Sequence, residues 1–160
     1  MKRPIKFTLL FLALLLPALI YVFLRRFGRN EFDVPPLYQA EVSAPEGCES
    51  YGAYAAPYVV PDSVLTMLDW SPEKVNLFIV GSHWSKAGLR LMAELPGMSF
   101  AVKEVPDEKR VSAVCGLLLR RPANAVMVDG SGKIRGQYDL NNREDYDRLI
   151  VEMKIMMVKY

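Results

Sequence analysis

A run of uncharged residues near the start of the chain, Phe7–Leu24, constrains the fold more than any other feature. A helix of this length spans roughly 27 Å, which matches the hydrocarbon core of a bilayer. Three basic residues flank each side: Lys2, Arg3 and Lys6 before the run, and Arg25, Arg26 and Arg29 after it. The run predicts an uncleaved transmembrane signal anchor within residues 1–27. A cleaved signal peptide is the alternative, but its apolar core is usually about 7–15 residues long and precedes a small-x-small site, which is absent here.

The orientation of this anchor depends on a nearly balanced charge distribution. The positive-inside rule compares basic residues on the two sides, and each side carries three. The N-terminal amine adds one positive charge before the run and favours an N-terminus in the cytoplasm. We therefore expect a single-pass membrane protein whose soluble domain is extracytoplasmic, in the periplasm.

The composition argues against several classes of protein. Lys and Arg number 20 and Asp and Glu number 18, for a formal net charge of +2. Such a balance provides no broad basic face, so nucleic acid is not an expected partner. Two Cys and one His cannot complete a four-ligand Cys/His zinc site. No Ser-His-Asp triad, paired-carboxylate site or phosphate-binding loop is visible, which favours a non-enzymatic role but leaves catalysis open.

The rest of the chain divides into an irregular lead-in segment, residues 28–62, and a patterned domain, residues 63–160. The lead-in segment holds five Pro and three Gly, which disfavour regular elements. The pattern beyond it predicts strands at Val75–Val80, Ser99–Val105, Ala125–Asp129 and Lys133–Tyr138, and helices at Lys86–Leu95, at Asp107–Leu118 and after Asn142. Strand–helix–strand units predict parallel pairing, and the final hairpin, which turns at Gly130–Gly132, adds an antiparallel strand. This order predicts an α/β fold: a thioredoxin-like mixed sheet with flanking helices.

The last predicted helix has the clearest pattern. Asn142 can cap it, and Asp145 stands three residues on, as in a capping box. Its apolar side chains fall on one face: Tyr146, Leu149, Ile150, Met153, Met156, Met157 and Tyr160. Met at helical spacing is typical of a core, and a thioether copper site is the alternative interpretation.

Three stretches resemble the SCO/SenC family, which is thioredoxin-like, membrane-anchored and associated with cytochrome oxidase assembly. They read RNEFDVPPLY, PYVVPDSVL and PANAVMVDGSGKIRGQYDLNNREDYDRLIVEMKIM. The last stretch resembles the hairpin and terminal helix of that family, and the middle of the chain resembles it poorly. The resemblance implies copper delivery or thiol–disulfide chemistry, carried out by a Cys-x-x-x-Cys pair and a distal His.

The chain departs from that family at each of these chemical positions. The loop after the first strand has Ser82, His83, Trp84 and Ser85, without Cys, and Arg121 stands where the distal His is expected. Copper(I) prefers thiolate or thioether ligands, and a hydroxyl cannot form a disulfide. We interpret this loop as a degenerate active site with no cofactor. His83, the only His, is an exposed loop residue in the simplest interpretation and a weak candidate for binding copper.

The two cysteines, Cys48 and Cys115, lie 67 positions apart and permit three interpretations. Cys115 falls on the apolar face of its predicted helix, which favours a buried free thiol. A structural disulfide with Cys48 is the second interpretation, and a redox pair is the third. Pro122 precedes a predicted strand where thioredoxin-like folds keep a cis-Pro loop, and the sequence leaves its isomer open.

A local group of basic side chains accompanies these residues, comprising Lys109, Arg110, Arg120 and Arg121. Such a group usually belongs to a solvated face, and contact with lipid headgroups is the alternative near a membrane.

These observations lead to a main functional hypothesis and two alternatives. The main one is a membrane-tethered, redox-inactive binding or assembly factor for a respiratory oxidase, with the membrane and a protein as partners. An alternative from another class is a thiol–disulfide oxidoreductase or copper chaperone that uses Cys48, Cys115 and His83. The other alternative is a purely structural anchor module of an envelope complex.

Overall fold

The structure is a computed structural model. It describes residues 33–159, except 41, 52, 53, 82, 83 and 98, together with residues 11, 13, 15–23 and 26; of residues 84–87, 158 and 159 it describes only the helical backbone. The chain divides into two compact units, an N-terminal unit (Met1–Phe32) and a C-terminal unit (Asp33–Tyr160).

The N-terminal unit is helical at each of its described residues. Among the residues that the structure describes, no helix combines the length and apolar character needed to cross a membrane. Several positions of the predicted anchor, Phe7–Leu24, lie outside the described residues. The anchor therefore stays a prediction.

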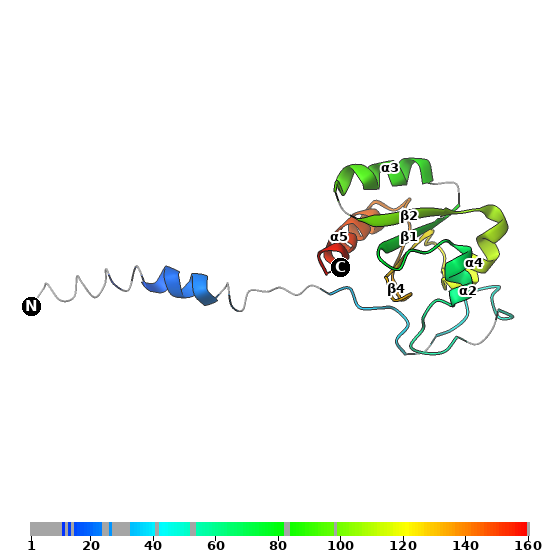
Figure 1. The fold of residues 1–160 in the computed structure, drawn as a ribbon, viewed down its shortest axis with the longest axis horizontal. Helices are drawn as coiled ribbons and strands as arrows, with labels where there is room; N and C mark the ends of the chain where they lie inside the picture. The colour runs from blue at the N-terminus through cyan, green and yellow to red at the C-terminus, as the bar shows by residue number, and fades with distance from the viewer. Residues whose placement is uncertain are drawn as a thin grey trace, which may run out of the picture. The chain divides into compact units, whose positions relative to one another are not determined.

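A four-stranded mixed sheet forms the centre of the C-terminal unit (Figure 1). In spatial order its strands are β2 (Phe100–Val105), β1 (Val75–Val80), β3 (Ala125–Val128) and β4 (Ile134–Tyr138). Strands β1 and β2 pair in parallel, whereas β1 with β3 and β3 with β4 pair antiparallel. The predicted α/β class, with a mixed sheet, is confirmed.

The predicted parallel pairing of the second strand–helix–strand unit is wrong, because β3 runs antiparallel to β1. Between β2 and β3 lie one turn of 3-10 helix, η1 (Asp107–Lys109), and a short helix, α4 (Arg110–Gly116). The connection through these helices does not return along the length of the sheet. Val105, the last residue of β2, pairs with Val80, and Ala125, the first residue of β3, pairs with Ile79, so the chain enters β3 at the end of the sheet where it left β2 and must run antiparallel to β1.

Helices cover both faces of the sheet (Figure 1). Besides α4 they are α2 (Asp62–Met67), α3 (Trp84–Glu94) and α5 (Arg143–Lys159). Leu77 and Ile79 of β1 belong to the core beneath α3 and α5, whereas Phe78 and Val80 belong to the core beneath α2 and α4. Successive side chains of a strand point to opposite faces, so β1 contributes to both cores. This explains why all of its side chains are buried and why five of its six residues are apolar. The exception, Asn76, is buried with its side-chain amide hydrogen-bonded to the Ser71 and Lys74 backbone.

Some boundaries differ from the predicted ones. Helix α3 begins at Trp84, two residues before the predicted Lys86. The predicted helix Asp107–Leu118 begins with the 3-10 turn η1, continues as α4 and ends at Gly116, and Leu118 adopts a left-handed backbone conformation with φ of 51°. Strand β3 ends at Val128, one residue short of the prediction, because the next residue already belongs to the turn.

Gly116 sets how closely α4 approaches α2. A Cβ atom at Gly116 would lie 2.6 and 2.7 Å from the two Cγ atoms of Val64. We expect Gly116→Ala to lower the free energy of unfolding by about 1–3 kcal/mol, because overpacking a core displaces its neighbours. Urea denaturation measures this effect. In a protein that already carries Val64→Ala, Gly116→Ala should no longer lower the free energy of unfolding, because the two Cγ atoms of Val64 are gone. An equal decrease with Val64 and with Ala at position 64 would contradict this explanation.

The predicted capping of α5 is partly different in the structure. Asn142 Oδ1 accepts a hydrogen bond from the Glu144 N–H (2.9 Å), as expected of an N-cap. Asp145 Oδ2 accepts from the Asp139 N–H (3.0 Å) instead of returning to Asn142, so the capping box is not closed. The predicted core face is buried at Tyr146, Leu149, Ile150, Met153 and Met156; Met157 is partly buried, and Tyr160 lies outside the described residues.

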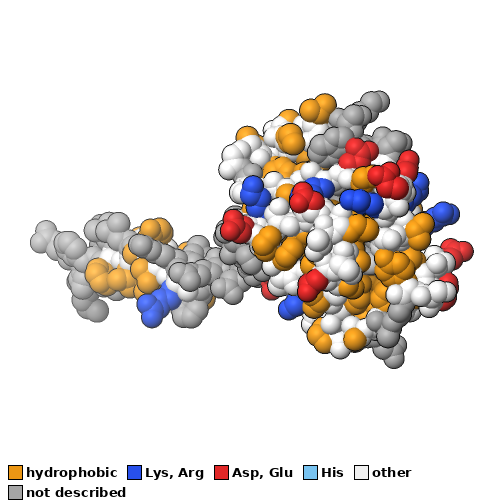
Figure 2. Space-filling view, turned by 45° about the vertical axis from the view of Figure 1, so that its right-hand side comes forward, with side chains coloured by type: hydrophobic (Ala, Val, Ile, Leu, Met, Phe, Trp, Pro, Cys, Tyr) orange, Lys and Arg blue, Asp and Glu red, His pale blue; other side chains and the backbone are white. Residues whose placement is uncertain are grey.

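The surface carries charges of both signs. On the face that Figure 2 shows, Lys and Arg side chains alternate with Asp and Glu among apolar patches. This mixture reflects the near balance of acidic and basic residues in the sequence.

Candidate functional site

The predicted degenerate active-site loop joins β1 to α3. Ser82 and His83 lie outside the described residues, and Trp84 and Ser85 form the first turn of the α3 backbone. On the other side, Gly81 directly follows β1 and has a φ of 106°, a conformation that favours glycine. The loop therefore starts from the carboxyl end of an inner strand.

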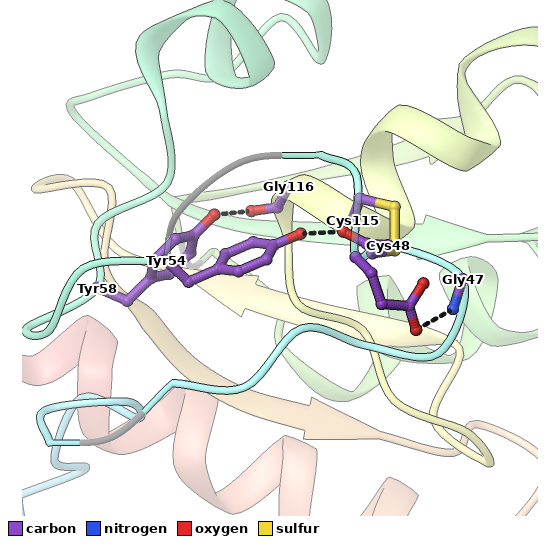
Figure 3. Close-up of a disulfide and its surroundings, with 7 residues drawn as sticks. Gly47, Cys48, Tyr54, Tyr58, Cys115 and Gly116 are labelled. Atoms are coloured by element: carbon purple, nitrogen blue, oxygen red, sulfur yellow. Dashed lines mark hydrogen bonds between the residues drawn. A yellow bond between two sulfur atoms is a disulfide. The ribbon is translucent and has the colours of Figure 1, made fainter.

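The two cysteines are joined in a disulfide that links the lead-in segment to α4 (Figure 3). The Cα atoms of Cys48 and Cys115 are 5.3 Å apart. The exposed fractions are 3% for Cys48 and 2% for Cys115, so both are buried. Of the three interpretations of these residues, the structure has the covalent pair, and neither cysteine remains as a free thiol.

Two tyrosines of the lead-in segment strengthen the same attachment (Figure 3). The Tyr58 hydroxyl donates to the Gly116 carbonyl (2.7 Å), and the Tyr54 hydroxyl donates to the Cys48 carbonyl (3.4 Å). Their ring centroids are 5.8 Å apart. Burial raises the pKa of Tyr58 well above its usual value, so this hydroxyl remains a donor. The Tyr58 bond holds the lead-in segment to α4, and the Tyr54 bond lies within the lead-in segment, next to the disulfide.

A pocket of about 870 Å³ lies between the lead-in segment and the loop before β3. Gly81 and Pro122 line it, together with Glu46 of the lead-in segment. The Arg121–Pro122 peptide bond is cis. The pocket thus adjoins the start of the predicted active-site loop and contains the predicted cis-Pro candidate.

Three arginines line this pocket: Arg110, Arg120 and Arg121. Arg120 is held in place, since its Nη2 donates to the Ser43 hydroxyl (2.6 Å) and to the Ser43 carbonyl (3.0 Å). Its guanidinium carbon also lies 5.8 Å from the centroid of the Tyr38 ring, in a cation–π arrangement. The local basic group of the sequence therefore contributes to a concave site. Only Lys109 turns elsewhere, where its Nζ donates to the Met67 carbonyl.

A buried ion pair, Asp129–Arg135, lies at the β3–β4 turn and was missed from the sequence. Asp129 Oδ2 accepts from Arg135 Nε at 2.7 Å, and Oδ1 accepts from the Ser131 N–H and hydroxyl and from the Lys133 N–H. Arg135 Nη1 also donates to the Val34 carbonyl (2.7 Å) of the lead-in segment. A carboxylate directly after an apolar strand and an Arg in the returning strand were the available signals. These contacts are structural, because every carboxylate oxygen has a partner within the protein.

The described residues do not include a metal cluster. No group of three or more His, Cys, Asp or Glu lies close enough together to hold an ion in the part of the chain that the structure describes. His83 falls outside that part. Met153 and Met156, considered as thioether ligands, are buried in the core beneath α3 and α5.

Comparisons with known proteins add no relative. No family model matches the chain, and neither a curated protein nor a solved structure matches it.

Proposed function

We propose that the chain is a membrane-tethered, thioredoxin-like protein that binds a partner and assists assembly of a respiratory oxidase without thiol or copper chemistry of its own. The observation that carries this proposal is the buried Cys48–Cys115 disulfide. Thiol–disulfide exchange requires a thiolate to reach a sulfur atom, and burial of both cysteines prevents such access. The bond serves as a tether of the lead-in segment.

The sheet supports the thioredoxin-like part of the proposal. Its order β2-β1-β3-β4, with one parallel and two antiparallel pairs, has helices on both faces. This is the arrangement that the SCO/SenC resemblance implies. The fold would place the loop after β1 beside Pro122, where the family keeps its reactive groups.

The disulfide also supports an extracytoplasmic location. Structural disulfides form and persist in oxidising compartments and are rare in the cytosol. Together with the apolar run Phe7–Leu24, this favours a periplasmic domain tethered to the membrane.

Copper delivery is disfavoured by the same chemistry. Copper(I) prefers sulfur ligands, and both cysteine sulfurs are occupied by the disulfide. Ser82 and Ser85 supply hydroxyls, which are poor ligands for this ion. A binding role therefore fits the residues better than metal transfer does.

Deletion of the gene is expected to lower the cytochrome oxidase activity of isolated membranes. Re-expression of the Ser82→Ala or His83→Ala variant should restore activity as fully as the wild-type chain does, because the proposal assigns no redox or copper step to these side chains. A chain from residue 28 onward, exported by a cleavable signal peptide, should restore less activity because it lacks the tether.

Two results would contradict this proposal. One is unchanged oxidase activity in the deletion strain. The other is tight, one-to-one copper(I) binding by the full chain that His83→Ala abolishes, since this would assign metal transfer to the loop.

A further inference from the structure

The charges that line the pocket beside Gly81 and Pro122 are mainly positive. Arg110, Arg120 and Arg121 contribute three positive charges, and Glu46 is the single acidic residue among its described lining residues. Arg110 and Arg121 form no ion pair with any carboxylate that the structure describes. Their guanidinium groups are exposed and remain available to a ligand.

The contacts of Arg120 within the protein hold its guanidinium in a position where it can bind an anion. Ser43 and the Tyr38 ring hold its guanidinium at the edge of the pocket. These contacts use Nη2 and one face of the group, which leaves donors on its other nitrogens. A positioned guanidinium loses less conformational entropy when it binds a carboxylate.

The floor of the pocket is apolar. Val80, Leu119 and Pro45, which are buried, line it together with Val114, which is partly buried. A second hollow of about 790 Å³, lined by Tyr38 and Tyr54 among others, shares Arg120 with the pocket. A ligand that fits both features carries carboxylates for the arginines and apolar groups for the floor, and it extends beyond a single small anion.

We propose that this arginine-lined pocket binds an acidic segment of the partner protein, in which carboxylate side chains alternate with apolar ones. The inference rests on the proposed function, because it specifies the chemistry of the partner. A hollow with an apolar floor suits inserted side chains of a peptide better than the flat surface of a membrane.

A labelled peptide of alternating Glu and Leu provides the test, with the full chain in a non-ionic detergent and fluorescence anisotropy as the measurement. We expect saturable binding that weakens as salt is added. The double substitution Arg110→Gln and Arg121→Gln should weaken it by about tenfold or more, because charge-assisted hydrogen bonds are lost. Glu46→Gln should tighten it, because a repelling carboxylate is removed from the rim.

Charge-matched controls separate this site from general electrostatics. The double substitution Arg143→Gln and Lys154→Gln, and the single substitution Glu144→Gln, change the charge by the same amounts on α5, among residues that do not line the pocket. They should leave the affinity unchanged, and a peptide of alternating Gln and Leu should bind poorly. Equal effects at α5 and at the pocket, or equal binding of the uncharged peptide, would overturn the proposal.

Other ligands give distinguishable outcomes. Displacement of the peptide by inorganic phosphate at matched ionic strength would make the pocket a small-anion site and overturn the proposal. Binding of phosphatidylserine vesicles that depends on Arg110 and Arg121, without binding of the peptide, would overturn it in favour of headgroup contact. If the wild-type chain does not bind the peptide and the Arg110→Gln/Arg121→Gln chain restores oxidase activity to the deletion strain, the peptide-binding inference fails and the assembly function stands. An unaffected deletion strain refutes the assembly function instead.

Discussion

Replacing Asp129 by alanine is expected to lower the free energy of unfolding of the C-terminal unit by about 3–5 kcal/mol, because it leaves a nearly buried guanidinium without its counter-ion. The Arg135 side chain is 12% exposed and the Asp129 side chain is fully buried. The substitution also removes the acceptor of the Ser131 and Lys133 N–H groups. Urea denaturation of the full chain, followed by the fluorescence of Trp70 and Trp84, measures the change.

An exposed ion pair provides the matched control for this substitution. Asp69 accepts from Lys103 Nζ at 2.8 Å, and its side chain is 96% exposed. Asp69→Ala should change stability little, since water already solvates the exposed Asp69 carboxylate in the folded state and an exposed ion pair contributes little. Substituting Arg135 by alanine in the Asp129→Ala variant should recover part of the lost stability, because the buried guanidinium without a counter-ion is then gone. Equal destabilisation by Asp69→Ala and Asp129→Ala would contradict the role assigned to burial.

The same carboxylate predicts a pH dependence. Burial alone would raise the pKa of Asp129, but hydrogen bonds from Lys133, Ser131 and Arg135 outweigh it and hold the pKa below its usual value. A carboxyl group with a lowered pKa in the folded state contributes stability above its unfolded pKa, which is about 4. This contribution is lost as the pH falls through the folded value. The stability difference between wild type and Asp129→Ala should therefore shrink below about pH 4, and a constant difference would contradict this account.

Elements with a strong local pattern were predictable from the sequence. The bounds of β1 were correct because a strand buried on both faces reads as a run that is apolar at every position but Asn76. The buried face of α5 was predicted at Leu149, Ile150 and Met153, because helical periodicity marks one side of a helix. In both cases the pattern of apolar residues that marks the element lies within the element itself.

Features that depend on distant segments were not predictable. The direction of β3 follows from the end of the sheet at which the connection after β2 returns, which no local pattern of β3 reveals. The contact of Arg120 with Ser43 joins residues 77 positions apart, so no spacing indicates it. The sequence identified Arg110, Arg120 and Arg121 as a basic group, but only the folded lead-in segment makes a pocket of them.

Loss of the disulfide is the second large effect that we expect. Substituting both Cys48 and Cys115 by alanine should lower the free energy of unfolding by about 4 kcal/mol, since the bond closes a long loop and restricts the unfolded chain. The lead-in segment should also loosen near Cys48, because the Tyr58–Gly116 hydrogen bond and the packing of Tyr58 in the core then hold it to α4 without the covalent link. Hydrogen exchange at the Cys48 and Tyr51 amides, which donate to the Pro45 and Cys48 carbonyls, reports this loosening.

The single substitutions distinguish a covalent link from ordinary packing. Either Cys48→Ala or Cys115→Ala alone breaks the bond, so each should cost nearly as much stability as the double substitution. Two unlinked thiols packed in the core would instead give small single effects that add up in the double variant. A thiol reagent should find no reactive thiol in the native wild-type chain and two after unfolding in reductant. Native thiols that react without reductant would contradict both the tether and the redox-inactive function built on it.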